Sequence, residues 1–309
     1  MSGVLSFDAL QLLIVAFGVG IAVGLTGMGG GALMTPALVF LGIPPTSAVA
    51  NDLVSAAITK SVGAAVHLRN GSPNKQLIKW LVLGSVPMAL VGSLIVKLIG
   101  PSGDQQKFLK AAIGCALLLT ATTYVVRMYL NLVRQATGRR RTEQNPTIRP
   151  LATLAIGALG GLLVGITSVG SGSLIMVGML LLYPTMSSLR LVGTDLLQAI
   201  PLVVAAAIGH ILITGVDWSV LIPLMIGGSL GTALGARLAS LVNQSVIRRG
   251  IVMVLTLTGL GMLGVDPTWV GILGAGMVIL GPVVWGAIRR QHGLPAFDHL
   301  GSATSGDDD

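Results

Sequence analysis

Charged side chains are scarce in this sequence. Only 10% of its 309 residues are Asp, Glu, Lys or Arg, whereas 53% are hydrophobic. Residues 9–51 and 150–189 contain no charged side chain at all. Because about 20 apolar residues span the hydrocarbon core of a bilayer, the chain must cross a membrane several times. A soluble globular fold is excluded, because a chain of this length could not bury so much apolar surface.

Cysteine is almost absent. Cys115 is the only one, so an internal disulfide and a cysteine–histidine zinc cluster are both excluded. Its position in an apolar run predicts a packed thiol. The sequence also lacks the Gly-x4-Gly-Lys-Ser/Thr pattern of a nucleotide-binding loop, so the chain cannot hydrolyse ATP itself. We expect no cofactor and no metal ion.

The net charge of +8 comes largely from basic residues in connecting loops. Lys and Arg collect in the cytoplasmic loops of membrane proteins, so this placement indicates topology, and we expect no nucleic-acid partner. The densest group lies in and beside a polar stretch at 131–149 and consists of Arg127, Arg134, Arg139, Arg140, Arg141 and Arg149.

The sequence contains the same pattern twice, 141 to 143 positions apart. Gly24-Leu-Thr-Gly-Met-Gly-Gly-Gly31 corresponds to Gly165-Ile-Thr-Ser-Val-Gly-Ser-Gly172. Four further residues recur 143 positions later: Asp52, His67, Gly84 and Gly92 return as Asp195, His210, Gly227 and Gly235. We therefore expect a first transmembrane repeat at 1–130, a basic cytoplasmic linker at 131–149, a second repeat at 150–265, a final transmembrane helix at 266–290 and a mobile tail at 291–309.

Hydropathy predicts an all-α, polytopic membrane protein. Two of its hydrophobic segments, 10–42 and 151–183, are interrupted by glycines near their middles. A straight helix of that length would reach ~50 Å, well beyond a hydrocarbon core of ~30 Å. We therefore expect each to form a helix–break–helix hairpin. The other predicted segments are 48–68, 77–99, 108–130, 190–213, 218–240, 247–264 and 267–288.

The charge distribution predicts inverted repeats in the plasma (inner) membrane. A cytoplasmic linker and C-terminus place both ends of 151–183 on the cytoplasmic side. Each repeat then has three full spans and one hairpin, so the two repeats must have opposite orientations. If segment 10–42 instead crosses once, the N-terminus is cytoplasmic. Repeats with glycine-broken segments indicate a transporter whose site lies at the repeat interface.

The glycine-rich breaks are the first candidate for that site. Unwound backbone exposes N–H groups, and the following helix directs its positive N-terminal end at them, which suits an anion. The alternative interpretation is close helix packing by small residues. The candidate substrate-binding residues are Thr26, Gly27, Met28, Gly29, Gly30, Gly31, Thr167, Ser168, Gly170, Ser171 and Gly172.

Lys60 lies near the middle of a predicted span, where an ionised lysine costs roughly 2.5–3.5 kcal/mol on insertion scales. One interpretation is a cation that meets an anionic substrate. The other is an ion pair, for which Asp195 is the better partner, because Asp52 is eight residues away on the same helix. The neutral residues Asn51, Thr194 and Gln198 are further candidates for lining the site.

The repeated acids and histidines have two interpretations each. Asp52 and Asp195 near the starts of their segments could stabilise helix N-termini, as an N-cap or a first-turn acid. Their alternative role is proton or ion-pair coupling. His67 and His210, 15 residues further on, could relay protons or pack at the membrane interface.

These features resemble the sulfite exporter TauE/SafE family of membrane transporters. The resemblance rests on the first glycine run leading to Pro36, on Leu41-Gly-Ile-Pro-Pro45 with Ala48-Val-Ala50, and on the weaker second copy, and it covers roughly residues 10 to 265. It implies transport of a small sulfur-containing anion such as sulfite, sulfoacetate or thiosulfate. The second copy departs from the pattern, since Ser168, Ser171 and Val177 replace Gly27, Gly30 and Pro36. The two halves of the site are therefore not equivalent.

The leading hypothesis is a secondary transporter, not an enzyme, for a small anion of the sulfite, sulfonate or thiosulfate type. Its partners are that solute and the lipid bilayer. The oligomeric state stays open, and a homodimer is one option. A passive anion channel is the first alternative. The second is an intramembrane serine hydrolase with Ser171 and His210 as a catalytic dyad.

Overall fold

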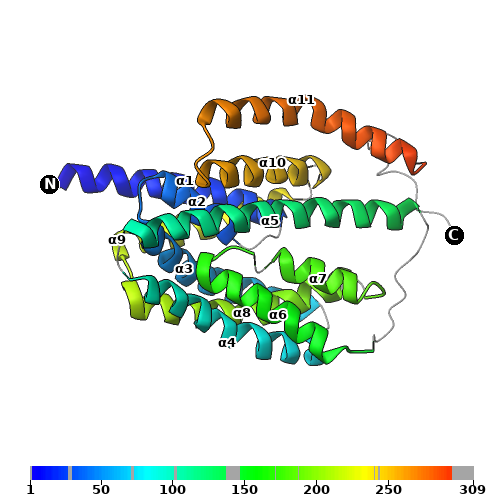
Figure 1. The fold of residues 1–309 in the computed structure, drawn as a ribbon, viewed down its shortest axis with the longest axis horizontal. Coiled ribbons are helices and arrows are strands. Elements are labelled where there is room, and N and C mark those ends of the chain that lie inside the picture. The colour runs from blue at the N-terminus through cyan, green and yellow to red at the C-terminus, as the bar shows by residue number, and fades with distance from the viewer. Residues whose placement is uncertain are drawn as a thin grey trace.

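The computed structural model is all-helical over the residues it describes, which are 2–26, 30–70, 73–100, 103–136, 147–170, 172–186, 188–239, 241–242 and 244–293. Figure 1 shows the helices running roughly along one long axis. The first half contains α1 (Ser2–Thr26), α2 (Gly31–Phe40), α3 (Pro45–Asn70), α4 (Lys75–Ile99) and α5 (Gly103–Ala136). The second contains α6 (Pro150–Thr167), α7 (Leu174–Leu182), α8 (Ser188–Thr214), α9 (Trp218–Leu238), α10 (Gln244–Met262) and α11 (Pro267–Gln291).

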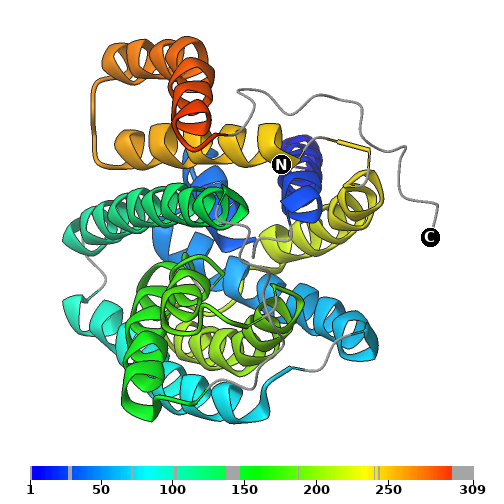
Figure 2. The same cartoon turned by 90° about the vertical axis from the view of Figure 1, so that its right-hand side faces the viewer.

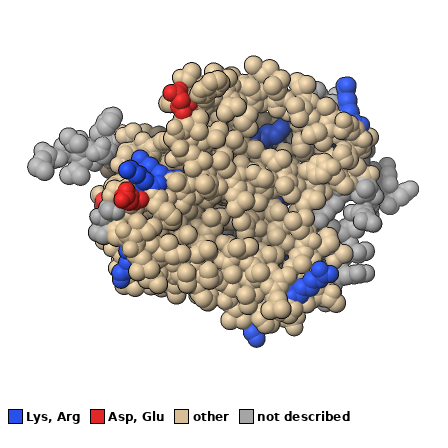
Figure 3. Space-filling view, in the orientation of Figure 1, with Lys and Arg blue, Asp and Glu red and all other residues tan. Residues whose placement is uncertain are grey.

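The predicted all-α membrane fold is confirmed. Among the described residues, 7 helices are long and apolar enough to cross a bilayer. Large hydrophobic side chains such as Leu98 and Leu212, each 77% exposed, cover the outer surface. Figure 3 shows a face made almost entirely of uncharged residues, with most of its few charges toward the edges of the view. Such a surface suits contact with lipid, because lipid tails are as apolar as the side chains themselves.

Short polar turns end the spans where the sequence predicts them. Asn74, Asp217 and Asp266 each precede a helix and accept a hydrogen bond from a backbone N–H in its first turn. These bonds satisfy N–H groups that the helix itself cannot pair. The side-chain hydrogen bond of Thr268, and next the bond from Thr268 N at 2.8 Å, lower the pKa of the exposed Asp266 carboxyl.

Segment 151–183 folds back on itself. The hydroxyl of Tyr183, after α7, accepts a hydrogen bond from Arg149 N at 3.0 Å and lies 2.5 Å from Thr153 Oγ1 at the start of α6. Further along, Gly178 packs on Ile156 and Gly160 packs on Ile175. These contacts pair α6 and α7 in opposite directions, so both ends of the segment lie together, as the predicted hairpin requires.

The two halves pack against each other through close helix contacts. In α4, a β-carbon added at Gly84 would lie 2.3 Å from Leu154 O of α6. In α9, one added at Gly227 would lie 2.4 Å from Leu13 O of α1. The same correspondence joins Gly92 to Leu162 and Gly235 to Ile21. Because these pairs are related by the repeat offsets, α4 on α6 and α9 on α1 are equivalent interfaces, which lie on opposite sides of the molecule in Figure 2.

Cys115 corrects one expectation from the sequence. It lies on α5 and is exposed, so the prediction of a packed thiol is wrong. An apolar run in a membrane protein does not separate protein-facing from lipid-facing positions, because both are hydrophobic.

Candidate functional site

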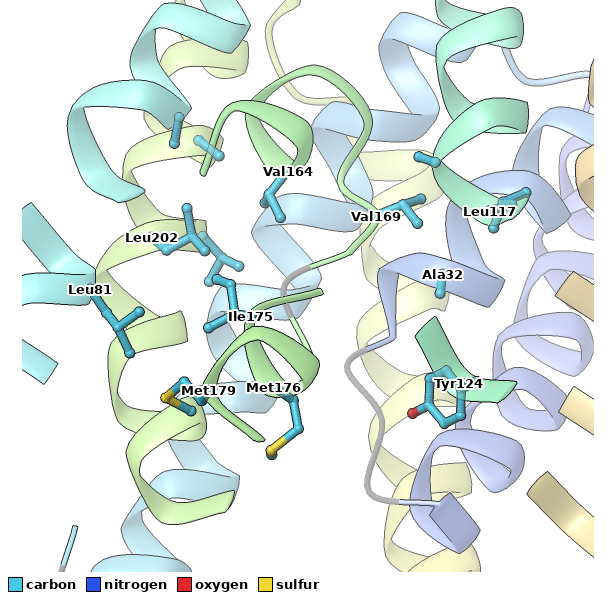
Figure 4. Close-up of a cluster of buried hydrophobic side chains, with 14 of the residues drawn as sticks. Ala32, Leu81, Leu117, Tyr124, Val164, Val169, Ile175, Met176, Met179 and Leu202 are labelled. Carbon is cyan, nitrogen blue, oxygen red and sulfur yellow. The ribbon is translucent and has the colours of Figure 1, made fainter. Parts of the chain in front are cut away.

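The start of α2 and the second glycine-rich break meet in the interior of the molecule. α2 begins at Gly31, after the first break, and α6 ends beside Ser168, in the second. A β-carbon added at Gly31 would lie 2.1 Å from Ser168 O and 2.9 Å from Ser168 Oγ. Figure 4 shows Val169 of the second break beside Ala32 of α2 and Leu117 of α5. The residues of two distant sequence segments therefore form one site, and glycine is required for their contact.

The second break has an unusual backbone. Ser168 adopts φ 62°, the only positive value at a described non-glycine residue, and Gly170 adopts φ 108°. A left-handed residue ends a helix, because it turns the chain away from the helix axis. The break therefore begins at Ser168, and its hydroxyl is directed across to the first half.

Asp52 of α3 receives that hydroxyl. Ser168 Oγ donates to Asp52 Oδ2 at 2.8 Å, and the Thr35 hydroxyl of α2 donates to the same oxygen. The carboxyl group is buried, with Asp52 only 2% exposed. One carboxylate oxygen thus joins three elements: α3, the half-helix after the first break, and the second break.

The first-turn interpretation of the two acids is wrong. Neither α3 nor α8 has an acidic residue in its first turn. Asp52 lies seven positions after Pro45, and Asp195 lies seven positions after Ser188. Both helices begin earlier than the hydropathy pattern indicates, so the acids lie well inside them.

Asp195 has different neighbours from its repeat equivalent. Gln198 Nε2, from the same helix, donates to Asp195 Oδ1 at 3.0 Å. Lys60, 9% exposed, is the charge that acts most strongly on Asp195. Among the described residues, Asp195 also acts on Lys60 more strongly than Asp52 does. The ion-pair interpretation of Lys60 with Asp195 thus has electrostatic support, and the substrate-contact interpretation stays a proposal.

His210 binds the helix that ends at the second break. Its Nε2 donates to Gly165 O at 2.7 Å, and the ring is fully buried. The carbonyls of a last helical turn have no intrahelical partner, so His210 stabilises this end of α6. Its Nδ1 atom is buried and has no hydrogen-bond partner among the described residues.

Some of the neutral candidate residues use their side chains within their own helix, and others keep a polar atom that makes no hydrogen bond in the described part of the structure. The hydroxyls of Thr26 and Thr167 donate to Ala22 O and Leu163 O of their own helices. Thr194 likewise donates to a carbonyl of its own helix, that of Arg190. In contrast, the side-chain carbonyl oxygens of Asn51 and Gln198 are buried and have no partner among the described residues.

Several candidate residues fall outside the described parts of the chain. Of the remaining glycines, Gly30 has open space where a β-carbon would lie, and Gly172 lies in the turn between the break and α7. The positions of which the structure describes nothing are Gly27, Met28, Gly29 and Ser171, and for His67 the side chain is not described.

Thr35 is the site residue that the sequence analysis missed. Its repeat equivalent is Met176, so no repeated polar signal marks it. The available signal was a hydroxyl four positions after Gly31 in a half-helix that otherwise has no polar side chain. This position lies one helical turn after the break, on the face that carries Gly31.

A helical membrane protein with two broken segments that meet between its halves has the architecture of a membrane transporter. Residues 12–262 match the family described as Sulfite exporter TauE/SafE. The chain belongs to this family, as the resemblance in its glycine runs predicted, and it is a multi-pass membrane protein.

Curated relatives have names of the same kind. The chain is similar to the "Probable membrane transporter protein YjnA" of Bacillus subtilis (strain 168), with 34% identity over 261 residues that cover 82% of this chain and 100% of the relative. YdhB of the same organism, also named a probable membrane transporter protein, is 29% identical over 82% of this chain and 100% of its own. A probable membrane transporter protein of Xylella fastidiosa (strain 9a5c) is 28% identical over 76% and 88% of the two chains. No solved structure matches this chain significantly.

Proposed function

We propose that this membrane transporter is a secondary transporter of a small sulfur-containing anion in the plasma membrane, and that the anion binds where the two breaks meet. The observation that carries the proposal is the contact of Gly31 with Ser168. There, hydroxyl donors and the start of α2 converge from different halves of the chain. Helix N-termini and donor groups of this kind favour negative charge.

Inverted repeats are part of this proposal, and helix directions support them. Successive contacts from Leu13 to Ile21 meet Gly227 to Gly235 in ascending order, so α1 and α9 run in the same direction. The α6–α7 hairpin returns to its starting end, so α8 repeats the direction of α6, and α9 opposes it. α1 therefore opposes α6, its own repeat equivalent.

Such a pair of repeats can transport a solute by alternating access. The site stays fixed near the middle of the membrane while one half moves against the other. The contact surfaces here are helix backbones in close approach, α4 on α6 and α9 on α1.

Reconstitution tests the proposal. Purified protein in liposomes should exchange labelled sulfite, thiosulfate or a sulfonate, saturably and faster when unlabelled anion is present on the opposite side. A passive channel would show no such trans-stimulation. Absence of movement for all three anions under every imposed gradient would refute the function.

A further inference from the structure

The two equivalent aspartates differ in what surrounds them. Asp195 has the cation Lys60 as its strongest charged neighbour. Asp52 is held chiefly by two neutral hydroxyls, those of Thr35 and Ser168, and Lys60 acts on it less strongly than either. Two acids that occupy matching repeat positions therefore have different hydrogen-bond partners, the hydroxyls of Thr35 and Ser168 for Asp52 and the amide of Gln198 for Asp195.

The charges of Lys60, Asp52 and Asp195 do not balance when all three groups are ionised. Lys60 contributes one positive charge, and Asp52 and Asp195 contribute two negative charges, all at residues that are no more than 9% exposed. Asp52 is contacted by Thr35 of α2, a helix without an ionisable side chain, and by Ser168 of the second break. Among the described residues, Lys60 is the charge that acts on Asp52. Arg127 of α5 is a further cation that acts on Asp195, more weakly than Lys60, but it is not among the charges that act on Asp52. Lys60, Asp52 and Asp195 together therefore carry one net negative charge.

This charge conflicts with anion binding. A carboxylate repels an anion strongly in a medium of low dielectric constant. It also occupies the donors, because each hydroxyl has a single proton to give, and those of Thr35 and Ser168 are directed to Asp52. An anion at the breaks must compete with Asp52 for the same two hydroxyl protons.

We propose that Asp52 binds a proton when the anion binds, so that one proton crosses the membrane with each anion. The inference rests on the proposed function, and it deepens it by naming the coupling ion and the residue that carries it. The step is a protonation: the carboxylate of Asp52 and H⁺ form the neutral carboxylic acid. The hydroxyl hydrogens of Thr35 and Ser168 then rotate from the carboxyl group to the anion.

The charge balance explains why binding of the proton and binding of the anion are coupled. The empty site contains ionised Lys60, Asp195 and Asp52, with a net charge of one negative unit. The site loaded with a monovalent anion contains a neutral Asp52, so it has the same net charge. Binding of the anion alone would double the buried negative charge, which the apolar interior opposes.

The first test uses the unaltered full-length protein. Liposomes that contain it and a trapped pH indicator receive labelled methanesulfonate or thiosulfate, anions that do not titrate near neutral pH. A proton gradient should drive accumulation of the anion, and about one proton should enter with each methanesulfonate. Anion exchange without any proton movement would overturn the inference and leave the proposed function intact. No exchange at all would refute the function, and the inference with it.

The second test replaces the carboxyl group. Asp52→Asn is neutral at every pH, so proton-driven accumulation should fall at least tenfold and the remaining exchange should lose its pH dependence. Asp104→Asn makes the same chemical change at a side chain that is 86% exposed, and it should behave as the unaltered protein does. Wild-type accumulation and pH dependence in Asp52→Asn would overturn the inference. If that variant does not fold, the proton-to-anion ratio of the unaltered protein decides.

A third variant separates proton binding from anion binding. Ser168→Ala removes one hydroxyl donor and leaves the carboxyl group of Asp52 in place. The apparent KM for the anion should rise, roughly tenfold or more for a hydrogen bond to a charged group. The proton-to-anion ratio should stay near one. A proton-to-anion ratio far below one with an unchanged KM would contradict the assignment of Ser168 to the anion and of Asp52 to the proton.

Discussion

At the residue scale, the site depends on a few side chains whose importance comes from their neighbours. Gly31 is required because Ser168 of the other half lies against it. Asp52 joins α2 to the second break because the hydroxyls of Thr35 and Ser168 share its Oδ2 atom. Lys60 interacts with both acids, and most strongly with Asp195. Each of these roles is a relation between segments that lie far apart in the sequence.

Gly31→Ala should destabilise the protein and reduce transport. Its β-carbon would lie 2.1 Å from Ser168 O, and overpacking of this kind costs about 1–3 kcal/mol. The thermal unfolding temperature in detergent measures the effect. Gly30→Ala is the matched control for stability, since nothing lies within 4 Å of the β-carbon that it would introduce. Equal unfolding temperatures for the two variants would argue against a tight contact between the breaks.

Lys60→Ala should also destabilise the protein if Lys60 is paired with Asp195. Removing one partner of a buried pair leaves an uncompensated charge and costs about 3–5 kcal/mol. The double variant Lys60→Met/Asp195→Asn should then recover the stability. Both are scored by thermal unfolding and by uptake. A stable Lys60→Ala protein with unchanged transport would remove Lys60 from the site, and a stable one without transport would favour direct contact with the anion.

At the scale of elements, the broken segments and their partner helices form two equivalent units. α6 packs on α4 and α1 packs on α9, through glycines that bring backbones together. Helices in lipid associate by such close approach, because burial of apolar side chains provides no driving force there. The glycines that recur in the sequence, including Gly84 and Gly227, are therefore explained by packing, whereas Gly31 is explained by contact between the breaks.

Gly84→Ala and Gly227→Ala should destabilise the protein by similar amounts. The added β-carbons would lie 2.3 Å from Leu154 O and 2.4 Å from Leu13 O, respectively. We expect a loss of about 1–3 kcal/mol for each, measured by thermal unfolding. Gly276→Ala on α11 is the control, because no atom lies within 4 Å of the position that its β-carbon would take. A tolerated change at only one of the two positions would mean that the interfaces are not equivalent.

At the scale of the whole molecule, two halves form one structure whose site lies between them. The main hydrophobic core contains residues from both, including Leu53 and Leu117 of the first half and Ile175 and Leu202 of the second. Neither half completes the site alone, since Asp52 needs Ser168. Under the proposed alternating access, relative movement of the halves would therefore change the contact between Asp52 and Ser168.

Cysteine accessibility should place both ends of segment 151–183 on one side of the membrane. In a Cys115→Ser background, Thr147→Cys and Thr185→Cys should react with an impermeant maleimide from the cytoplasmic face, and both positions are exposed. Val216→Cys, between α8 and α9, should react from the opposite face. Reaction of the first two from different faces would mean that the segment crosses once, and the inverted arrangement would be lost.

The sequence by itself determined the class and where the two glycine-rich segments are interrupted. A backbone in lipid must pair its own N–H and C=O groups, and only a helix does so within one segment. Charge-free apolar runs therefore predict membrane-spanning helices. Glycine clusters predicted where α1 and α6 end, and both helices end inside these clusters. The repeat offset identified the paired residues, since duplicated segments retain their spacing.

Only the tertiary structure decided what those residues contact. A repeat predicts equal roles for Asp52 and Asp195, but the packing of different segments gives Asp52 two hydroxyl donors and leaves Asp195 with the amide of Gln198 on its own helix. Thr35 was missed and Cys115 was misassigned, because in lipid an apolar neighbourhood in the sequence is the same for buried and for lipid-facing positions. Contacts between distant segments depend on helix rotation and register, and local sequence spacing does not contain that information.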